Sequence, residues 1–397
     1  MAAATTTAPA RGGGAQRSFL QFVQDTVADG GHNRHALTDR ITANMTLDRG
    51  EMQLTVLPSS ATDADASTLA RALSLRDYGI GARLGTGAFG CVYAATCKRT
   101  GQRCAVKVEL TKGREPSQLS VEWRTYSFLR NNAGVLRALA FYEPKARAPR
   151  DGVTLRLMVM QLADDTLDGA TCTAGAVEND AYDAAAHGHV PRSWPRALST
   201  HAGLWAGARM VRALQAMHAR GVVHRDVKPQ NVAVVRRHGT TDLAFFDLGL
   251  AKRVITDAGH LPYEQTDRFM GTALYASPAV HAGVRASRRD DLWSAGIVAC
   301  ACAGIHFPWM ALPAIRGKTH NDTARTARRR RLRIMGDIKS ERGQWTHLLP
   351  PQWVEYFDAV EALQYADTPD YDALVDALMS VDDPYAPPQV NELLTPT

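Results

Sequence analysis

Residues 224–231 read His-Arg-Asp-Val-Lys-Pro-Gln-Asn, and residues 247–249 read Asp-Leu-Gly. Together they place two carboxylates, a lysine and an asparagine amide at fixed spacing, and a glycine-rich loop and a second lysine precede them. Such a combination would arise by chance in fewer than about 10⁻⁴ of chains. A solvated charged loop therefore does not explain the pattern, and these residues are candidates for chemistry.

The residue types in these two stretches suit the transfer of a phosphoryl group. That reaction needs an attacking hydroxyl held in line and neutralisation of the charge on the phosphate oxygens, with little covalent chemistry. We predict that Asp226 orients the hydroxyl and accepts its proton, and that Lys228 stabilises the γ-phosphate of ATP. Asn231 and Asp247 are the predicted metal ligands, because amide and carboxylate oxygens suit a Mg²⁺ ion that bridges phosphates.

A glycine-rich loop and a strand lysine lie upstream of these motifs. Residues 85–90 read Gly-Thr-Gly-Ala-Phe-Gly between two strand-like runs, so backbone amides can approach phosphate oxygens that a Cβ would keep away. A strand after the loop, rather than a helix, argues against a dinucleotide-binding fold. Lys107 lies in a predicted strand, where a buried amine needs an anion; phosphates and Glu122 on the next predicted helix would supply it. The alternative is an edge lysine that faces water.

The hydrophobic periodicity predicts a small β-rich region followed by a mostly helical one. The first region has predicted strands at 78–84, 91–96, 103–110, 135–142 and 153–162, with one helix at 117–130. In the second region apolar stripes predict helices that include 204–217, 292–302, 353–363 and 371–381. The fold class is therefore α+β, with a small antiparallel sheet carrying one helix and a larger α-helical body.

Composition excludes several classes of protein. The six cysteines are scattered without a Cys-x-x-Cys pair, so a zinc site and a disulfide framework are not indicated and a reducing compartment is the simpler interpretation. No apolar run is long enough to predict a membrane span. Much of the net charge of +6 comes from arginines within residues 325–333, which suit a nuclear address, an anion-docking patch or a solvated helix face. Because no aromatic residues alternate with these arginines, nucleic acid is not an expected partner.

Over roughly 78–381 these motifs resemble the protein kinase superfamily. Residues 271–277, Gly-Thr-Ala-Leu-Tyr-Ala-Ser, and residues 287–292, Ser-Arg-Arg-Asp-Asp-Leu, are similar to the casein kinase 1 superfamily. The spacing of Glu122 and Tyr126 is also similar to that group. Three further residues resemble its tau-tubulin kinase branch: Gln161, Ala233 and Trp293. The resemblance implies a bilobal Ser/Thr protein kinase that uses ATP and Mg²⁺, acts on protein substrates and needs no obligatory loop phosphorylation.

The resemblance also implies the nucleotide-binding residues. They are Leu84, Gly85, Gly87, Gly90, Val92, Ala105, Lys107, Glu122, Met160, Leu162 and Ala233. Residues 159–162 resemble the hinge of the family, with Met160 at the back of the adenine pocket. Two supporting residues are implied as well: Asp291 would accept hydrogen bonds from the backbone of the 224–231 loop, and Thr272 would support Asp226 and Lys228.

Three departures from the family pattern stand out. Leu248 replaces the usual phenylalanine and changes packing only. Leu274 stands where the family commonly has an arginine for phosphate on primed substrates, so primed recognition is not assumed. Ser277 is followed by Pro278 and Ala279 but not by the usual glutamate, so another contact must anchor that loop.

The resemblance and the composition divide the chain into four parts. We expect a largely disordered N-terminal extension at 1–70, a kinase N-lobe at 71–163, a C-lobe at 164–382 with an insertion near 168–195, and a tail at 383–397. A transit peptide is the alternative for the leader, which has no acidic residue before Asp25. We expect a monomer in the cytoplasm or the nucleus. Two other functions stay open: a pseudokinase that serves as a scaffold, and a kinase of small molecules.

Overall fold

A computed structural model describes residues 78–87, 90–112, 115–143, 153–171, 199–237, 240–312 and 322–379. These residues form two compact units. The first takes in the described residues up to Trp123 and those of 138–162, and the second takes in 124–137 and the described residues from Ala163 onward. The expected N-terminal extension, the expected C-terminal tail and residues 172–195 of the expected insertion lie outside the described residues.

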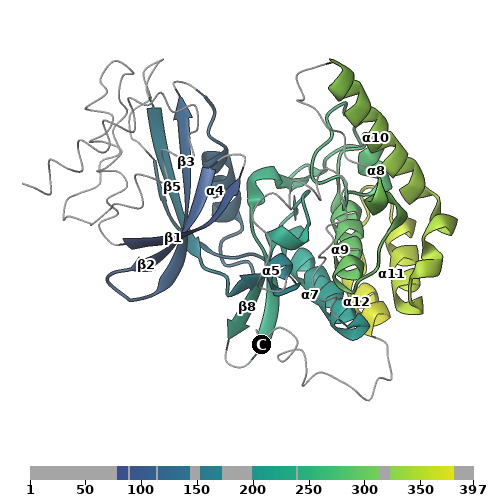
Figure 1. The fold of residues 1–397 in the computed structure, drawn as a ribbon, viewed down its shortest axis with the longest axis horizontal. Helices are drawn as coiled ribbons and strands as arrows, with labels where there is room; N and C mark the ends of the chain where they lie inside the picture. Colours follow the sequence, from purple (N-terminus) through teal and green to yellow (C-terminus); the bar gives the residue numbers. More distant parts are fainter. Residues whose placement is uncertain are drawn as a thin grey trace, which may run out of the picture. The chain divides into compact units, whose positions relative to one another are not determined.

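The first unit is built on an antiparallel sheet with the strand order β1-β2-β3-β5-β4 (Figure 1). Its strands are β1 (Tyr78–Gly87), β2 (Gly90–Cys97), β3 (Arg103–Lys112), β4 (Ala138–Tyr142) and β5 (Val153–Gln161). Alternate residues of β2, β3 and β5 form a buried apolar cluster on one face, which includes Tyr93, Val106 and Leu157. Because side chains alternate between the faces of a strand, the residues between these point to the opposite face.

Helix α4 (Gln118–Phe128) follows β3 and is the single helix predicted for this part of the chain. Trp123 on α4 stacks on Phe141 of β4, with ring centroids 5.4 Å apart. The predicted strands at 78–84, 91–96, 103–110 and 153–162 and the helix at 117–130 are confirmed, with ends within three residues of the predicted ones.

The predicted strand at 135–142 is wrong in its first half. Strand β4 begins only at Ala138. Val135, which belongs to the second unit, instead forms an isolated parallel bridge with Phe245 of the same unit. There the Leu136 amide donates to the Phe245 carbonyl at 3.0 Å. The apolar run therefore pairs with two different segments, Val135 with Phe245 and β4 with β5. Hydrophobic periodicity alone does not show where one pairing ends and the other begins.

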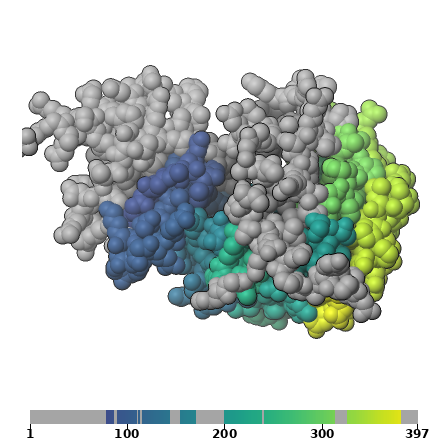
Figure 2. Space-filling view, turned by 60° about the horizontal axis from the view of Figure 1, so that its bottom comes forward, coloured from purple at the N-terminus to yellow at the C-terminus, as the bar shows by residue number. Residues whose placement is uncertain are grey.

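The second unit is mainly helical, as the sequence predicts. Its helices are α5 (Leu167–Thr171), α7 (Thr200–His218), α8 (Pro278–His281), α9 (Arg288–Cys302), α10 (Asp322–Ser340), α11 (Pro351–Ala362) and α12 (Tyr371–Met379). Short 3₁₀ turns occupy Pro229–Asn231, Leu248–Leu250, Pro308–Ala311, Arg342–Gln344 and Thr346–Leu348. Helix α7 packs against α9 and α12, and in Figure 2 the yellow C-terminal segment lies beside the teal one. Among the described residues no helix is long and apolar enough to span a membrane.

Short strands in the second unit are missing from the sequence prediction. Strands β6 (Asp165–Thr166), β8 (Val232–Arg237) and β9 (Thr240–Phe245) form an antiparallel sheet in the order β6-β8-β9. Strand β7 (Val222–Val223) pairs with β10 (Lys252–Arg253), and β11 (Ile255–Thr256) pairs with β12 (Gly259–His260). Because β7 and β8 flank residues 224–231 and β9 ends just before Asp247, these strands fix the backbone of both motifs.

Candidate active site

Asp226 is the centre of a hydrogen-bonded cluster in the second unit. Its Oδ1 accepts a bond of 2.7 Å from the Thr272 hydroxyl, and its Oδ2 lies 3.0 Å from the Lys228 ammonium. The Asn231 amide nitrogen donates to the Asp226 carbonyl at 2.9 Å and to its Oδ2 at 3.2 Å. The structure therefore brings Asp226, Lys228 and Asn231 together, and the predicted support of Asp226 by Thr272 is confirmed.

Buried Asp291 holds the backbone that carries this cluster. Its carboxylate accepts from the amide of His224 at 2.6 Å and from that of Arg225 at 2.8 Å, as predicted. His218 Nε2 lies 3.0 Å from the same carboxylate, and His218 Nδ1 lies 2.8 Å from the Tyr371 hydroxyl. Although burial disfavours the charged form, the hydrogen bonds and charge of His218 and the backbone bond from Arg225 keep the pKa of Asp291 below its ordinary value.

Asp247 lies at a backbone position with positive φ. Its φ is 59°, and its amide donates to the Tyr126 hydroxyl of α4 at 3.2 Å. A non-glycine residue in this region of φ is uncommon and is often found at functional sites. The next residue, Leu248, is fully buried, which agrees with a role in packing only. His224 Nε2 lies 3.1 Å from the carbonyl of Phe246, so the two motifs are tied together.

Lys107 and Glu122 form an ion pair in the first unit. Lys107 lies in β3 between β2 and β5, so the alternative of an edge lysine is wrong. Its ammonium lies 2.7 Å from Glu122 Oε2, and the Glu122 side chain is 3% exposed. The predicted pairing of the strand lysine with the helix glutamate is confirmed.

The strand register places five of the predicted nucleotide-binding residues on one face of the sheet. Gly85 lies opposite Val92, Val92 opposite Lys107, and Ala105 opposite Met160. Directly opposed residues in antiparallel strands point to the same side, and so do residues two apart along a strand. Gly85, Val92, Lys107, Ala105 and Met160 therefore share the face opposite the apolar cluster.

Apart from Glu122 on α4, the other predicted nucleotide-binding residues lie near the ends of strands or in the second unit. Leu84 is 53% exposed in β1, Leu162 follows β5, and Ala233 is fully buried in β8 of the second unit. Gly87 lies opposite Gly90, where φ is 154° and an added Cβ would come within 1.8 Å of the Val108 carbonyl oxygen. Only glycine fits there without moving the strand. Ala88 and Phe89 lie outside the described residues.

The donor atoms on these residues fit Mg²⁺ and phosphate. Because the Asn231 amide nitrogen bonds to Asp226, its oxygen is the atom that remains for a cation. Together with the Asp247 carboxylate it gives the hard oxygen ligands that Mg²⁺ prefers. Within the described ranges no group of three or more His, Cys, Asp or Glu side chains could hold a metal ion.

A family model described as a protein kinase domain matches residues 78–383. The chain belongs to the protein kinase family. Its antiparallel sheet and helices fit the bilobal α+β kinase fold, and kinase domains generally use ATP and Mg²⁺. Sequence analysis missed two buried side chains of this kinase domain: His218, which contacts Asp291, and Lys339, which contacts residues 273–276.

The kinase segment 271–277 is anchored by a buried lysine. Lys339 of α10 is fully buried, and its ammonium donates to the carbonyls of Ala273, Leu274 and Ala276 at 2.8, 3.1 and 2.6 Å. Ser277 adds a hydroxyl bond of 2.5 Å to Asp290 of α9. The expectation that another contact replaces the missing glutamate is confirmed.

His281 of the kinase domain lies beside Lys339 and is held neutral. Its Nδ1 lies 2.8 Å from the Leu332 carbonyl, and its Nε2 lies 3.0 Å from the Ala273 carbonyl and 3.3 Å from the Lys339 ammonium. A neutral ring carries one N–H, so only one of its two nitrogens donates. Burial first, and the charge of Lys339 second, lower the pKa of His281 to about 3.

This low pKa predicts a loss of stability in acid. Between about pH 6.5 and pH 3 the unfolded chain binds a proton at His281 that the folded domain does not, so the free energy of unfolding falls as pH is lowered. We expect His281 to contribute about 2–3 kcal/mol of that fall between pH 7 and pH 4. Urea unfolding of wild type and His281→Gln at both pH values measures it, because glutamine keeps a donor and an acceptor but does not titrate. Equal pH dependence in the two proteins would contradict the assignment.

Proposed function

We propose that this chain is an active Ser/Thr protein kinase that transfers the γ-phosphoryl group of ATP to protein hydroxyls. The observation that carries the proposal is the arrangement around Asp226, whose two carboxylate oxygens are held by Thr272 and by Lys228 and Asn231. A general base must be fixed within hydrogen-bond reach of the hydroxyl that it deprotonates. The Thr272 bond orients the carboxylate for that step.

Each of the other residues has a part in the same reaction. Lys228 would neutralise charge on the γ-phosphate, and Lys107, oriented by Glu122, would contact the α- and β-phosphates. Asn231 and Asp247 would hold Mg²⁺, which when bound neutralises charge on the phosphate oxygens. Preorganised charges of this kind are the main source of rate enhancement in phosphoryl transfer.

Specificity for serine and threonine rests on Lys228. A lysine two residues after the base would lie beside a short aliphatic hydroxyl, whereas a tyrosine ring needs more room. Membership of the casein kinase 1 superfamily is likewise a proposal, based on residues 271–277 and 287–292. Membership of its tau-tubulin kinase branch is a proposal based on Gln161, Ala233 and Trp293. Because residue 274 is leucine and not arginine, the proposal does not include recognition of phosphate on primed substrates.

The competing function is a pseudokinase that binds partners without turnover. The paired Lys107 and Glu122 and the ordered contacts of Asp226 favour activity, because a domain released from catalysis has no need to keep them. We further propose a monomer that acts in the cytoplasm or the nucleus. Among the described cysteines, Cys97, Cys104 and Cys300 are free thiols, which suits a reducing compartment.

The proposal is tested by a transfer assay with identification of the acceptor. The full chain is incubated with labelled Mg·ATP and casein, and the product is hydrolysed to phosphoamino acids. We expect label on phosphoserine and phosphothreonine, and none with the Asp247→Ala variant, which lacks a metal ligand. Label on phosphotyrosine alone would contradict the specificity. A wild type that binds ATP but transfers nothing would support the pseudokinase, and transfer to metabolites but not peptides would support a kinase of small molecules.

A further inference from the structure

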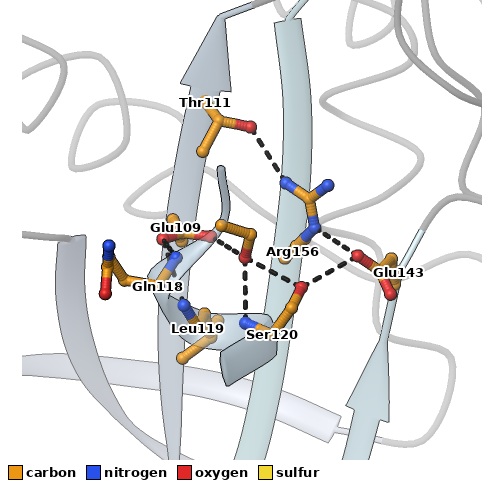
Figure 3. Close-up of polar contacts among 8 residues, drawn as sticks. Glu109, Thr111, Gln118, Leu119, Ser120, Glu143 and Arg156 are labelled. Carbon is orange, nitrogen blue, oxygen red and sulfur yellow. Dashed lines mark hydrogen bonds and ion pairs between the residues drawn. The ribbon is translucent and has the colours of Figure 1, made fainter. Parts of the chain in front are cut away.

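Glu109 of β3 makes a buried contact with the first turn of α4. It lies two residues after Lys107, so both side chains leave the same face of the strand. Its Oε1 accepts from the backbone amides of Gln118 at 2.9 Å and Leu119 at 3.2 Å, and its Oε2 accepts from the Ser117 hydroxyl (Figure 3). Only 4% of Glu109 is exposed, so this contact is shielded from solvent.

The charge on Glu109 is what the start of α4 requires. The first amides of a helix have no partner within it, and the helix dipole places partial positive charge there. Ser117 meets part of this need by accepting from the Ser120 amide at 2.9 Å. The first turn of α4 contains no acidic residue of its own, so the negative charge comes from the strand. Charge-assisted bonds of this type are about twice as strong as neutral ones.

Strand β3 thus holds α4 at two places. Lys107 pairs with Glu122, and Glu109 holds Gln118 and Leu119. Two residues of a strand span about 6.6 Å, and the four-residue step along the helix from Gln118 to Glu122 rises about 6.0 Å. The two spacings match closely enough that a fixed first turn brings Glu122 level with Lys107.

A second set of contacts connects the same turn to the rest of the sheet. The Ser120 hydroxyl donates to Glu143 at 2.8 Å, and Arg156 of β5 donates to Glu143 at 2.6 Å and to Thr111 of β3 at 2.9 Å (Figure 3). The first turn of α4 is therefore tied to both β3 and β5. Because Glu143 is exposed, its contacts with Ser120 and Arg156 stabilise the turn only weakly by themselves. They act on the same turn of α4 that buried Glu109 holds.

We propose that Glu109 is a positioning residue for phosphoryl transfer, which clamps the first turn of α4 to β3 and so keeps Glu122 on Lys107. The proposal rests on the proposed function, because its purpose is to orient the lysine for the phosphates of ATP. According to this proposal, contacts within the first unit hold Glu122 beside Lys107.

The first test compares Glu109→Ala and Glu109→Gln with a matched control. Glu115→Gln is the control, because Glu115 is exposed, lies between the same strand and helix, and accepts from the Lys112 amide rather than from α4. We expect Glu109→Ala to lower kcat/KM for Mg·ATP by about 10–10²-fold, the effect of a small misplacement of a positioning group. Glu109→Gln should lose less and Glu115→Gln nothing. Wild-type kcat/KM in Glu109→Ala would overturn the proposal.

A double-mutant cycle separates positioning from general stability. If Glu109 acts only through Glu122, adding Glu109→Ala to Glu122→Gln should lower kcat/KM by less than two-fold further. A structural role would instead multiply the two losses, and that outcome would overturn the proposal. Because this cycle compares kcat/KM values, it needs an active wild type.

Hydrogen exchange supplies a readout that does not depend on catalysis. In Glu109→Ala the amides of Gln118 and Leu119 should exchange at least ten-fold faster, while those of the β3 core stay protected as in Glu115→Gln. Unchanged exchange at both amides would overturn the proposal. If the wild type transfers no phosphate, the proposed function fails while the exchange result still decides whether Glu109 clamps the helix.

Discussion

Replacing Asp226 by asparagine is expected to lower kcat by about 10²–10⁴-fold, the range that a general base contributes. Asparagine has nearly the same shape and its oxygen can still accept from Thr272, but it cannot take the proton of the substrate hydroxyl. Binding of Mg·ATP should change little, because Asn231 and Asp247 are the predicted metal ligands. Steady-state kcat with a casein substrate and the Kd of a non-hydrolysable ATP analogue measure the two effects.

Asp242→Asn is the matched control for this substitution. Asp242 lies in β9 with a half-exposed side chain and pairs with Arg209 at the surface, so its loss should leave kcat within two-fold of wild type. An Asp226→Asn variant that keeps more than a tenth of wild-type kcat would show that this carboxylate is not the base. Loss of ATP binding in the same variant would point instead to a collapsed loop.

The sequence predicted the first unit well because its strands have one buried face. In β2 and β3 apolar and polar environments alternate, so Tyr93 and Val106 indicate a strand by period alone. The short strands of the second unit carry no such signal. Residues 232–235 of β8 are buried on both sides, and a continuous apolar run of that length does not distinguish a buried strand from a helix.

The candidate site could be read from the sequence only where its residues are close along the chain. Asp226, Lys228 and Asn231 lie within residues 226–231, so their closeness along the chain already implies their contact. Glu109 and Lys339 could not be found in this way. A glutamate in a strand and a lysine in an arginine-rich helix both look solvated, and only tertiary contacts reveal that each is buried and partnered.

Replacing Lys339 by methionine is expected to lower the free energy of unfolding by about 3–5 kcal/mol. Methionine fills similar space but removes the ammonium donor from the carbonyls of residues 273, 274 and 276, of which only that of Leu274 keeps the Trp309 indole N–H, at 3.1 Å. Burial lowers the pKa of Lys339 well below its ordinary value, yet three carbonyl acceptors and the Trp309 ring at 5.1 Å favour the ammonium form. Urea unfolding at neutral pH measures the loss.

The position of Lys339 predicts an effect on substrate binding as well as on stability. Because the anchored carbonyls adjoin Thr272, which bonds to Asp226, a loosened segment should raise KM for the protein substrate more than KM for ATP. Arg333→Met is the control on the same helix, since Arg333 is exposed and its loss should change stability by less than about 0.5 kcal/mol. If the Lys339→Met domain were as stable as this control, water would have replaced the ammonium as the donor to these carbonyls. The proposal that Lys339 anchors residues 271–277 in place of the missing glutamate would then be wrong.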